Sequence, residues 1–386
     1  MTTSALARIN RGRLLRALAH SEPRSRAELA EETGLSVATV SRAVASLSAL
    51  GLVTQSEAAD PTGGRPRTLV AFGDGAATLV VDVADRHTEV AAISLTGETL
   101  ERRLEEVEAG QDPEARLTHT LATIDAAVAA WPPGRRLLGL GVGVPGPVDE
   151  RGVVEFAPAI GWREVPLGPL LRERLGIPVA VHNDANLIAV AESEFGAEPR
   201  PRSLVVLAVF DGVGSGIVVD GRLWEGATGA SGQLGRMLLT LPAVRNVYEG
   251  FGDLESHLGT SAVAERALEL GIALDPAGDV WGQLLVDLPP TDLRARGLAS
   301  DVLDEFAMAL VNVCALIDPE AIVLAGRFAP IADAVVPELH RRLTRRVLHV
   351  PRIFPQTTAA PGTLLGAALA AERAFGPLEQ LLDTRT

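Results

Sequence analysis

The residues best suited to a defined chemistry lie on one face of a short segment near the N-terminus. Small or hydrogen-bonding side chains and a single arginine recur there at helical spacing, namely Ala38, Thr39, Ser41, Arg42 and Ala45. Small side chains allow a helix to lie close against base edges in a major groove, and polar side chains can bond to those edges. This pattern predicts a helix that recognises double-stranded DNA.

The flanking residues predict how that helix is held. Ser25 and Glu28 have the spacing of a capping box, so a first helix is expected to begin at Arg26. Gly34 suits the turn to a second helix, which Ser36 can cap. The buried stripe of the second helix is expected at Val37, Val40, Val44 and Leu47. Two short helices joined by a glycine turn predict a helix-turn-helix.

A further helix and a pair of strands would complete a winged domain. An amphipathic helix over Leu6 to Ala19 is expected to have an apolar side at Ile9, Leu14, Leu15 and Leu18. Its outward arginines would be Arg8, Arg11, Arg13 and Arg16. Leu52–Thr54 and Thr68–Val70 can pair around Pro61–Arg67 as a wing, from which Arg65 and Arg67 can enter a minor groove or contact phosphates. The predicted DNA contacts are Ser36, Ala38, Thr39, Ser41, Arg42, Arg65 and Arg67.

The charge distribution supports this interpretation. Residues 1–72 hold nine arginines and six acidic residues, whereas the remainder holds 26 arginines and 43 acidic residues. Positive charge is therefore concentrated in the segment shaped for DNA, although the whole chain has a net charge of −14. The alternative is an ordinary three-helix bundle with no nucleic-acid role.

Length and composition limit the class of protein. The 386 residues can form two or three domains, and 47% hydrophobic to 22% charged residues is the balance of a soluble globular protein. No apolar run approaches the ~20 residues of a membrane span, and no signal peptide precedes the first helix, so we expect a cytoplasmic protein without a membrane partner. Cys314 is the only cysteine and the seven histidines are scattered, so neither a metal site nor a cofactor is expected.

Beyond a Gly-, Pro- and Asp-rich segment at Ala58–Ala77, interpreted as wing plus linker, apolar runs typical of strands alternate with helical segments. Strands are expected at Leu79–Val83, Val90–Leu95, Glu98–Leu104, Leu137–Val144, Val179–His182, Leu204–Phe210, Ile217–Val219 and Ala321–Leu324. Helices are expected at Pro113–Ala130, Leu167–Leu175, Ala185–Phe195, Ala262–Leu270, Asp301–Leu316 and Ile331–Val347. A strand meander followed by βα crossovers predicts an α/β body.

Four motifs follow one another in this body: Gly141–Asp149 (GVGVPGPVD), Gly161-Trp162, Asn183–Asn186 (NDAN) and Asp211–Ile217 (DGVGSGI). Their order resembles the ROK family of repressors, open reading frames and sugar kinases. The resemblance implies a two-lobed, actin-like ATPase fold over residues 73–386, with a lobe break near residue 182, a sugar cleft between the lobes, and assembly into dimers or tetramers. The winged helix-turn-helix over residues 1–72 marks the regulator branch of the family.

The resemblance also implies a set of ligand contacts. Asp184 matches the family's catalytic base and Asn183 the adjacent sugar contact; alternatively, both residues only cap the following helix. Gln233 and Arg236 stand where the family has the Glu and His of its E-I-G-H segment. Glu255 matches another sugar contact, and its alternative is a surface carboxylate at the start of a helix. Arg236 indicates either an anionic sugar derivative or a cleft that has lost its ligand.

The parts that handle phosphate in the family are altered in this sequence. Asp82–Thr88 stands in place of a D-x-G-G-T hairpin, with Asp85 where a glycine would approach phosphate. A like-charge pair 4 Å apart costs about 4 kcal/mol at an effective dielectric constant of ~20, so ATP binding is not expected. At the second phosphate loop, Phe210 and Asp211 replace the family's Gly-Thr. The glycines that follow in Asp211–Ile217 are weak evidence for phosphate binding, because a tight hairpin also needs glycine for its φ angles. Ala325–Arg327 replaces a Gly-Gly pair.

The family's zinc motif is replaced as well. The segment Asn246–Glu255 has other residues at all three cysteine positions, so a tetrahedral zinc ion has no ligand set there. The sequence therefore predicts a kinase-inactive transcriptional regulator, a repressor, that binds a two-fold operator as a homodimer or homotetramer. A sugar-type effector would change the spacing of the paired DNA-binding domains. Two alternatives are an active sugar kinase with a vestigial N-terminal bundle and a ligand-free dimeric DNA-binding protein.

Overall fold

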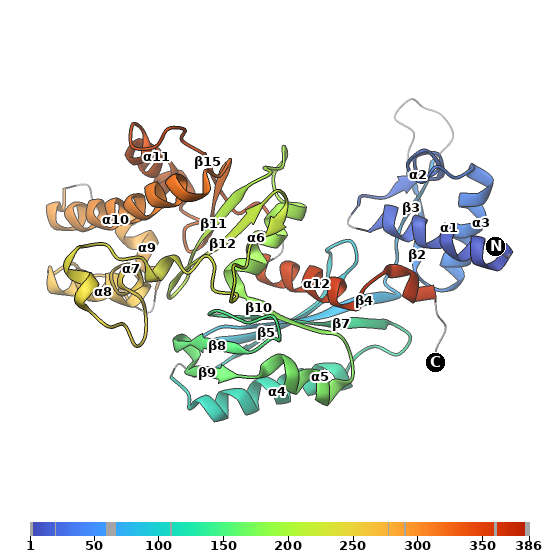
Figure 1. The fold of residues 1–386 in the computed structure, drawn as a ribbon, viewed down its shortest axis with the longest axis horizontal. Coiled ribbons are helices and arrows are strands. Elements are labelled where there is room, and N and C mark those ends of the chain that lie inside the picture. Colours follow the sequence, from blue (N-terminus) through green and yellow to red (C-terminus); the bar gives the residue numbers. More distant parts are fainter. Residues whose placement is uncertain are drawn as a thin grey trace.

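The computed structural model describes residues 3–19, 21–58, 67–108, 110–276, 278–288, 291–358 and 361–382. These residues form a mixed α/β structure in which an N-terminal unit, here called the head (residues 3–72), lies beside a larger body (Figure 1). The body is built on two five-stranded sheets. Among the described residues, no helix combines the length and apolar content that crossing a membrane requires.

The described residues of the head form three helices and a small sheet. The helices are α1 (Thr3–Leu18), α2 (Arg26–Thr33) and α3 (Val37–Ala49), and the strands are β1 (Arg24–Ser25), β2 (Val53–Ala58) and β3 (Arg67–Phe72). The capping box is present, because Ser25 accepts from the backbone N–H of Glu28 and the Glu28 carboxylate accepts from that of Ser25. Gly34 ends α2 at a φ of 67°, and Ser36 caps α3. The helix-turn-helix is thus confirmed.

Three details of the predicted head packing are wrong. Val37 is 52% exposed in the first turn of α3, and the buried stripe consists instead of Val40, Ala43, Val44 and Leu47. Ile9 is 40% exposed on α1. Both residues precede the described buried apolar residues of their helix, which begin at Leu14 in α1 and at Val40 in α3. Arg11 does not face outward, because it lies one turn before the buried Leu15 on the same face of α1 and donates to Ser46 at 2.9 Å.

The strand pair of the wing is confirmed. Strands β2 and β3 pair antiparallel, from Val53 opposite Phe72 to Ala58 opposite Arg67. Arg67 is exposed at the start of β3. Residues 59–66 lie outside the described residues, so the predicted contact of Arg65 with DNA stays a prediction.

The first sheet of the body has the strand order β10-β7-β4-β5-β6. Its strands are β4 (Ala76–Val83), β5 (His87–Ser94), β6 (Thr99–Glu106), β7 (Arg136–Val144) and β10 (Val179–Asn183). The predicted meander β4-β5-β6 is antiparallel, whereas β7 runs parallel to both β4 and β10. Helices α4 (Pro113–Ala129) and α5 (Leu167–Leu175) cover one face, and α6 (Asp184–Phe195) and α12 (Gly362–Phe375) cover the other (Figure 1).

The second sheet has the order β13-β12-β11-β14-β15. Its strands are β11 (Leu204–Val209), β12 (Val213–Val219), β13 (Arg222–Leu223), β14 (Ala321–Gly326) and β15 (Arg352–Pro355). One face packs on α6, which therefore contacts both sheets. The other face packs on α7 (Asp253–Leu258), α8 (Thr260–Glu269), α10 (Leu293–Ile317) and α11 (Ala332–Leu343). Short elements complete the body: β8 (Val154–Ala157), β9 (Trp162–Val165), α9 (Val280–Gly282) and the turns η1 (Pro158–Ile160), η2 (Leu234–Arg236), η3 (Pro242–Arg245), η4 (Gln283–Asp287) and η5 (Leu378–Leu382).

The α/β class is confirmed, but the sequence analysis missed several elements. Strands β8, β9, β13 and β15 have only two to four residues each, too few for an alternating pattern to stand out. The helix α12 was missed because Gly362–Phe375 is apolar on nearly every side and so lacks a helical period. For α10, the predicted start at Asp301 was too late, since Asp292 caps the helix at Leu293.

Glycines allow α12 to pack closely on two neighbours. A Cβ atom on Gly141 of β7 would lie 2.1 Å from the carbonyl oxygen of Ala367, in α12. A Cβ atom on Gly366, in α12, would lie 2.0 Å from the carbonyl oxygen of Leu187 in α6. Neither position admits a side chain unless α12 moves, since interiors are packed without spare volume.

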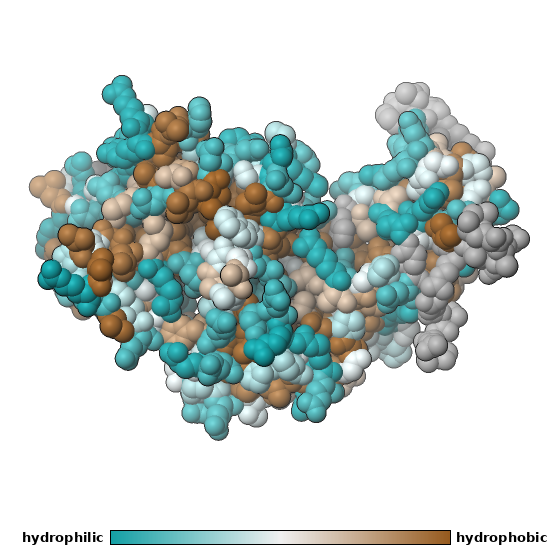
Figure 2. All heavy atoms as spheres, in the orientation of Figure 1, coloured by the Kyte–Doolittle hydropathy of each residue, from teal (hydrophilic) through white to brown (hydrophobic). Residues whose placement is uncertain are grey.

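Head and body share one hydrophobic core. The head contributes residues of α1, α2, α3 and its sheet, and the body contributes Ala76, Leu95, Leu138 and Leu381. Leu381 belongs to η5, which follows α12 and lies against α1. The contact involves the first sheet of the body, and Figure 2 shows a notch between the head and the part of the body built on the second sheet. The head is therefore fixed to one half of the body.

The connection between β3 and β4 is a packed joint. The backbone N–H of Gly75 donates to the carbonyl of Gly51 in the head at 3.2 Å, and the N–H of Arg136 donates to the carbonyl of Gly75 at 2.8 Å. The predicted linker, in its described part, therefore holds the head in place through backbone hydrogen bonds.

Gly75→Ala is expected to loosen this joint. A Cβ atom at residue 75 would lie 2.4 Å from the carbonyl oxygen of Gly51, and overpacking of this kind costs about 1–3 kcal/mol. Thermal unfolding and limited proteolysis would measure the effect. Gly297→Ala is the matched control, because a Cβ atom there meets nothing within 4 Å on an exposed face of α10; it is expected to stabilise the protein by up to about 1 kcal/mol. Native stability of the Gly75→Ala protein would show that the joint is not tightly packed.

Candidate DNA-binding and ligand-binding sites

The candidate DNA-binding surface is the outward side of α3. The predicted contacts in this helix lie on the side opposite its buried stripe, with Ala38, Arg42 and Ala45 exposed and Thr39 and Ser41 half-buried. Arg42 makes only a long contact with the carbonyl of Ala38, at 3.4 Å, and its other N–H groups donate to no described residue. The guanidinium is therefore available to a partner.

Ser36 has a structural role in this surface. Its Oγ accepts from the backbone N–H of Thr39 at 3.2 Å, and the two hydroxyl groups lie 2.9 Å apart. The cap fixes the N-terminal end of α3, which is the end that enters the groove in helix-turn-helix proteins.

The five predicted ligand contacts line one cleft of about 610 Å³ in the body. They are Asn183, Asp184, Gln233, Arg236 and Glu255. Their elements are the end of β10, the start of α6, the turn η2 and the first turn of α7. The wall also includes the β4–β5 turn of the first sheet and the β11–β12 turn of the second. Residues up to 72 positions apart in the sequence thus converge on one space, while their role in binding stays a prediction.

Asn183 and Asp184 both cap α6 and face the cleft. Asn183 Oδ1 accepts from the N–H of Asn186 at 3.2 Å, so Asn183 caps α6, while its contact with a ligand stays a prediction. Asp184 Oδ1 accepts from the N–H of Ala185 at 2.7 Å and from Asn183 Nδ2 at 2.9 Å. Burial raises the pKa of Asp184 to about 6; the charge of Glu255 adds to this rise, and the hydrogen bonds oppose it. Asp184 is therefore expected to change charge near pH 6.

Glu255 is not a surface carboxylate. It is half-buried, and its Oε1 accepts from the backbone N–H of Val213 at 2.9 Å. Burial raises the pKa of Glu255, whereas backbone hydrogen bonds from Val213 and Gly252 and the charge of Arg236 lower it. The carboxylate is thus held at a fixed position on the cleft wall.

The glycines of the β11–β12 turn are explained by close packing. None of Gly212, Gly214 and Gly216 has a positive φ, so the alternative that the hairpin needs glycine for its φ angles is wrong. A Cβ atom on Gly212 would lie 2.0 Å from Oε1 of Glu255, and one on Gly216 would lie 2.4 Å from the carbonyl oxygen of Ala185. The glycines let Glu255 and α6 approach the sheet.

Arg236 does not make the cleft positive. Its guanidinium lies 5.3 Å from the centroid of the Phe156 ring and makes a long contact with the carbonyl of Gly250, at 3.5 Å. Gln233 is half-buried, and its side chain has no hydrogen-bond partner among the described residues. Three arginines line the cleft, namely Arg86, Arg236 and Arg327. Six acidic residues line it, namely Asp82, Asp85, Asp184, Asp211, Glu255 and Asp279. The cleft therefore has an excess of negative charge.

Charged and aromatic side chains occupy the end of the cleft where the resemblance places nucleotide phosphates. Asp85, in the β4–β5 turn, is close enough to Asp211, in the β11–β12 turn, for the latter's charge to add to burial in raising the pKa of Asp85. Arg327, after β14, donates to Asp211 at 3.3 Å. Phe210 lines the same region and is 37% exposed. Carboxylates in this position oppose the approach of a phosphate.

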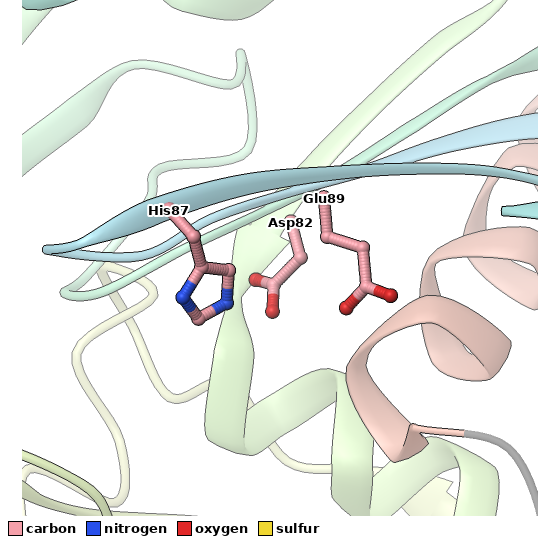
Figure 3. A group of neighbouring side chains, drawn as sticks. All are labelled: Asp82, His87 and Glu89. Carbon is pink, nitrogen blue, oxygen red and sulfur yellow. The ribbon is translucent and has the colours of Figure 1, made fainter. Parts of the chain in front are cut away.

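One cluster at the cleft wall was missed by the sequence analysis. Asp82, His87 and Glu89 lie together under the β4–β5 hairpin, with their possible ligand atoms all within 4.8 Å of one another (Figure 3). Asp82 pairs with Glu89 across the two strands, and His87 shares the face of Glu89 because side chains alternate along a strand. The histidines are scattered along the sequence, but the register of the hairpin brings one of them to two carboxylates. The cluster depends on that register, which the pattern within a single strand does not give.

A winged-helix head on a two-lobed body with a polar cleft defines a DNA-binding transcriptional regulator. This chain belongs to the ROK family, whose model matches residues 78–373, and the model of the MarR family matches residues 8–66. Both domain types expected from the sequence are thereby confirmed.

Individual relatives agree with this assignment. A putative xylose repressor of Caldicellulosiruptor sp. (strain Rt8B.4) is 25% identical over 350 residues, which cover 88% of each chain. A transcriptional regulator of Mycobacterium bovis is 30% identical over 328 residues, which cover 81% of this chain and 73% of its own length. The crystal structure of a ROK family transcriptional regulator, a homolog of the E. coli MLC protein, superposes with a TM-score of 0.72 at 22% identity over 97% of this chain and 98% of that one. This last likeness shows a shared fold.

Asp184→Asn is expected to stabilise the folded protein at pH 7.5 and to have little effect at pH 4. Folding raises the pKa of Asp184 from 3.8 to about 6, so its ionisation increasingly destabilises the folded state as pH rises through that interval. The loss is on the order of 3 kcal/mol above pH 6. Asparagine has no such loss and retains an oxygen for the N–H of Ala185.

Urea unfolding at the two pH values would measure this effect. Asp301→Asn, which changes an exposed carboxylate on α10, is the matched control and is expected to leave the stability unchanged at both. A stabilisation by Asp184→Asn that is equal at pH 4 and pH 7.5, or a destabilisation at pH 7.5, would contradict the assigned environment of Asp184.

Proposed function

We propose that this protein is a transcriptional repressor whose affinity for DNA is set by an uncharged sugar bound in the body cleft. One observation carries the proposal: α12 connects the cleft to the head. Thr363, in its first turn, lines the cleft. Phe375, at its end, packs on the hydrophobic core of the head together with Leu378 of η5. A ligand that moves α12 therefore moves the surface on which α1 rests.

The head supplies the DNA-binding half of this function. The outward side of α3 has the small and polar residues that major-groove contact requires, and Arg67 stands at the base of the wing. We propose a homodimer that presents two such heads to a two-fold operator. In such a dimer the relative position of the two bodies sets the distance between the heads, which must match the spacing of the operator half-sites. Relatives that are named repressors support repression as the effect of DNA binding.

The cleft favours a neutral polyhydroxyl ligand over an anion. Asp184 and Glu255 can accept hydrogen bonds from sugar hydroxyls, and the six carboxylates outnumber the three arginines. Phe156 and Phe251 add apolar surface for a sugar face. Since relatives are named xylose repressors, a neutral pentose such as xylose is the first candidate. We set aside the anionic derivative that Arg236 alone indicated.

We propose further that the body transfers no phosphoryl group. Asp85 and the Asp211–Arg327 ion pair occupy the place where kinases of this fold bind nucleotide phosphates, and Phe210 lies beside them. Phosphoryl transfer needs donors and metal ions around those phosphates, and this end of the cleft presents carboxylates instead.

Calorimetric titration would test the ligand. The probes are xylose and other neutral pentoses and hexoses, with gluconate and glucose 6-phosphate as anionic counterparts. A neutral sugar is expected to bind, and Glu255→Gln is expected to weaken it about 10-fold, because the variant loses a charge-assisted hydrogen bond. Tighter binding of the anions, or sugar-dependent ADP release from Mg-ATP, would overturn the proposal.

Anisotropy titrations would test the DNA surface, using an operator selected from bound genomic fragments. Arg42→Ala is expected to weaken operator binding by ~1–3 kcal/mol and to relax the sequence preference, as loss of a base contact does. Arg65→Ala and Arg67→Ala are expected to weaken all sequences and to reduce the salt dependence. Arg200→Ala, an exposed arginine of the body, is the matched control. An Arg42→Ala protein with native affinity and preference would place the interface elsewhere.

A further inference from the structure

We propose that Asp82, His87 and Glu89 bind a divalent transition-metal ion at the wall of the cleft. The assignment is independent of the proposed sugar and of the DNA-binding function. One imidazole and two carboxylates form a donor set that zinc, cobalt and manganese accept, whereas magnesium and calcium prefer oxygen ligands alone.

The strand pairing puts the three side chains in position. Asp82 on β4 stands opposite Glu89 on β5, and His87 precedes Glu89 by two residues on the same face. All three side chains extend from this face of the hairpin into one space, with α6 and α12 on the far side of it (Figure 3). Their ligand atoms lie within 4.8 Å of one another. Two atoms that both bind one zinc ion at about 2.0–2.2 Å lie less than 4.8 Å apart. Rotations at the ends of these three side chains would bring their ligand atoms to that spacing.

The surroundings of Glu89 fit a ligating carboxylate. Glu89 is 4% exposed, and its Oε1 accepts from Nε of Arg102, on β6. This contact fixes the carboxylate while its second oxygen stays available, an arrangement common among metal-ligating carboxylates.

The surroundings of Asp82 lack a donor. Among the described residues, none donates a hydrogen bond to the Asp82 carboxylate. The nearby Arg102 donates to Glu89 instead. Enclosed carboxylates are costly unless they are paired with a cation or bound to a metal. Gly143 of β7 leaves room at this carboxylate, since a Cβ atom there would lie 3.1 Å from Asp82 Oδ1. A divalent ion would supply the missing positive charge.

The cluster is open to the cleft. Asp82 and His87 line the cleft wall, so an ion held by the three residues has a route of entry. With three protein ligands, it also keeps a coordination position for water or for a hydroxyl of a cleft ligand.

Metal titration of the full-length protein, first stripped with a chelator, would test the site. Cobalt(II) absorption reports coordination by nitrogen and oxygen, and calorimetry with zinc gives the stoichiometry. One ion per chain is expected, and His87→Gln and Asp82→Asn are each expected to weaken binding at least about 10-fold. His349→Gln changes an exposed histidine outside the cleft and is expected to bind as the native protein does.

Each outcome decides the proposal. Thermal unfolding verifies that the variants are folded. The Glu89→Gln protein can lose stability because Arg102 loses its partner. The His87→Gln protein then decides the question, since His87 is only half-buried and its replacement disturbs the fold less. Magnesium is expected to bind at least about 10-fold more weakly than zinc, because it gains little from imidazole. Absent zinc and cobalt binding, equal binding of magnesium, or native affinity in the His87→Gln protein would each overturn the assignment.

Discussion

The close contact of α12 with β7 on one side and α6 on the other is the constraint on which the structure depends. Because Gly141 and Gly366 leave no space for a Cβ atom, α12 cannot shift against the first sheet without moving α6. The helix α6 in turn packs on both sheets, so a change in the angle between them acts on α12 directly. At its far end α12 leads into η5 and the core of the head. Packed interiors transmit displacement because they have little free volume to absorb it.

The proposed function assigns recognition, and no catalysis, to a body of the kinase type. Its negative charge comes from elements of both sheets, since Asp85 follows β4, Asp184 follows β10, Asp211 follows β11, and Glu255 belongs to α7 on the second sheet. Carboxylates repel a phosphate, and they can accept hydrogen bonds from hydroxyl groups. In the proposed function, this body keeps a sugar-sized cleft and transfers no phosphoryl group.

Local signals in the sequence predicted the head well, since Ser25, Glu28, Gly34 and Ser36 act through neighbours only a few residues away. Strands and helices of the body followed from their apolar periods, and the five cleft residues from motifs whose order resembled a family. Features that depend on tertiary packing were not predictable. The helix α12 is buried on nearly every side and so has no period, and no described residue buries Val37 at the start of α3. The meeting of His87 with Asp82 and Glu89 requires the register of a hairpin, which alternation within one strand does not give.

The central claim is that the cleft and the head are energetically coupled. Linkage requires that the factor by which a sugar changes operator affinity equals the factor by which the operator changes sugar affinity. The most direct measurement is therefore a pair of calorimetric titrations of the sugar, one into the free protein and one into the protein saturated with operator. The account predicts sugar affinities that differ about 5- to 150-fold, with the weaker in the operator complex. Equal sugar affinity in the two titrations would contradict it.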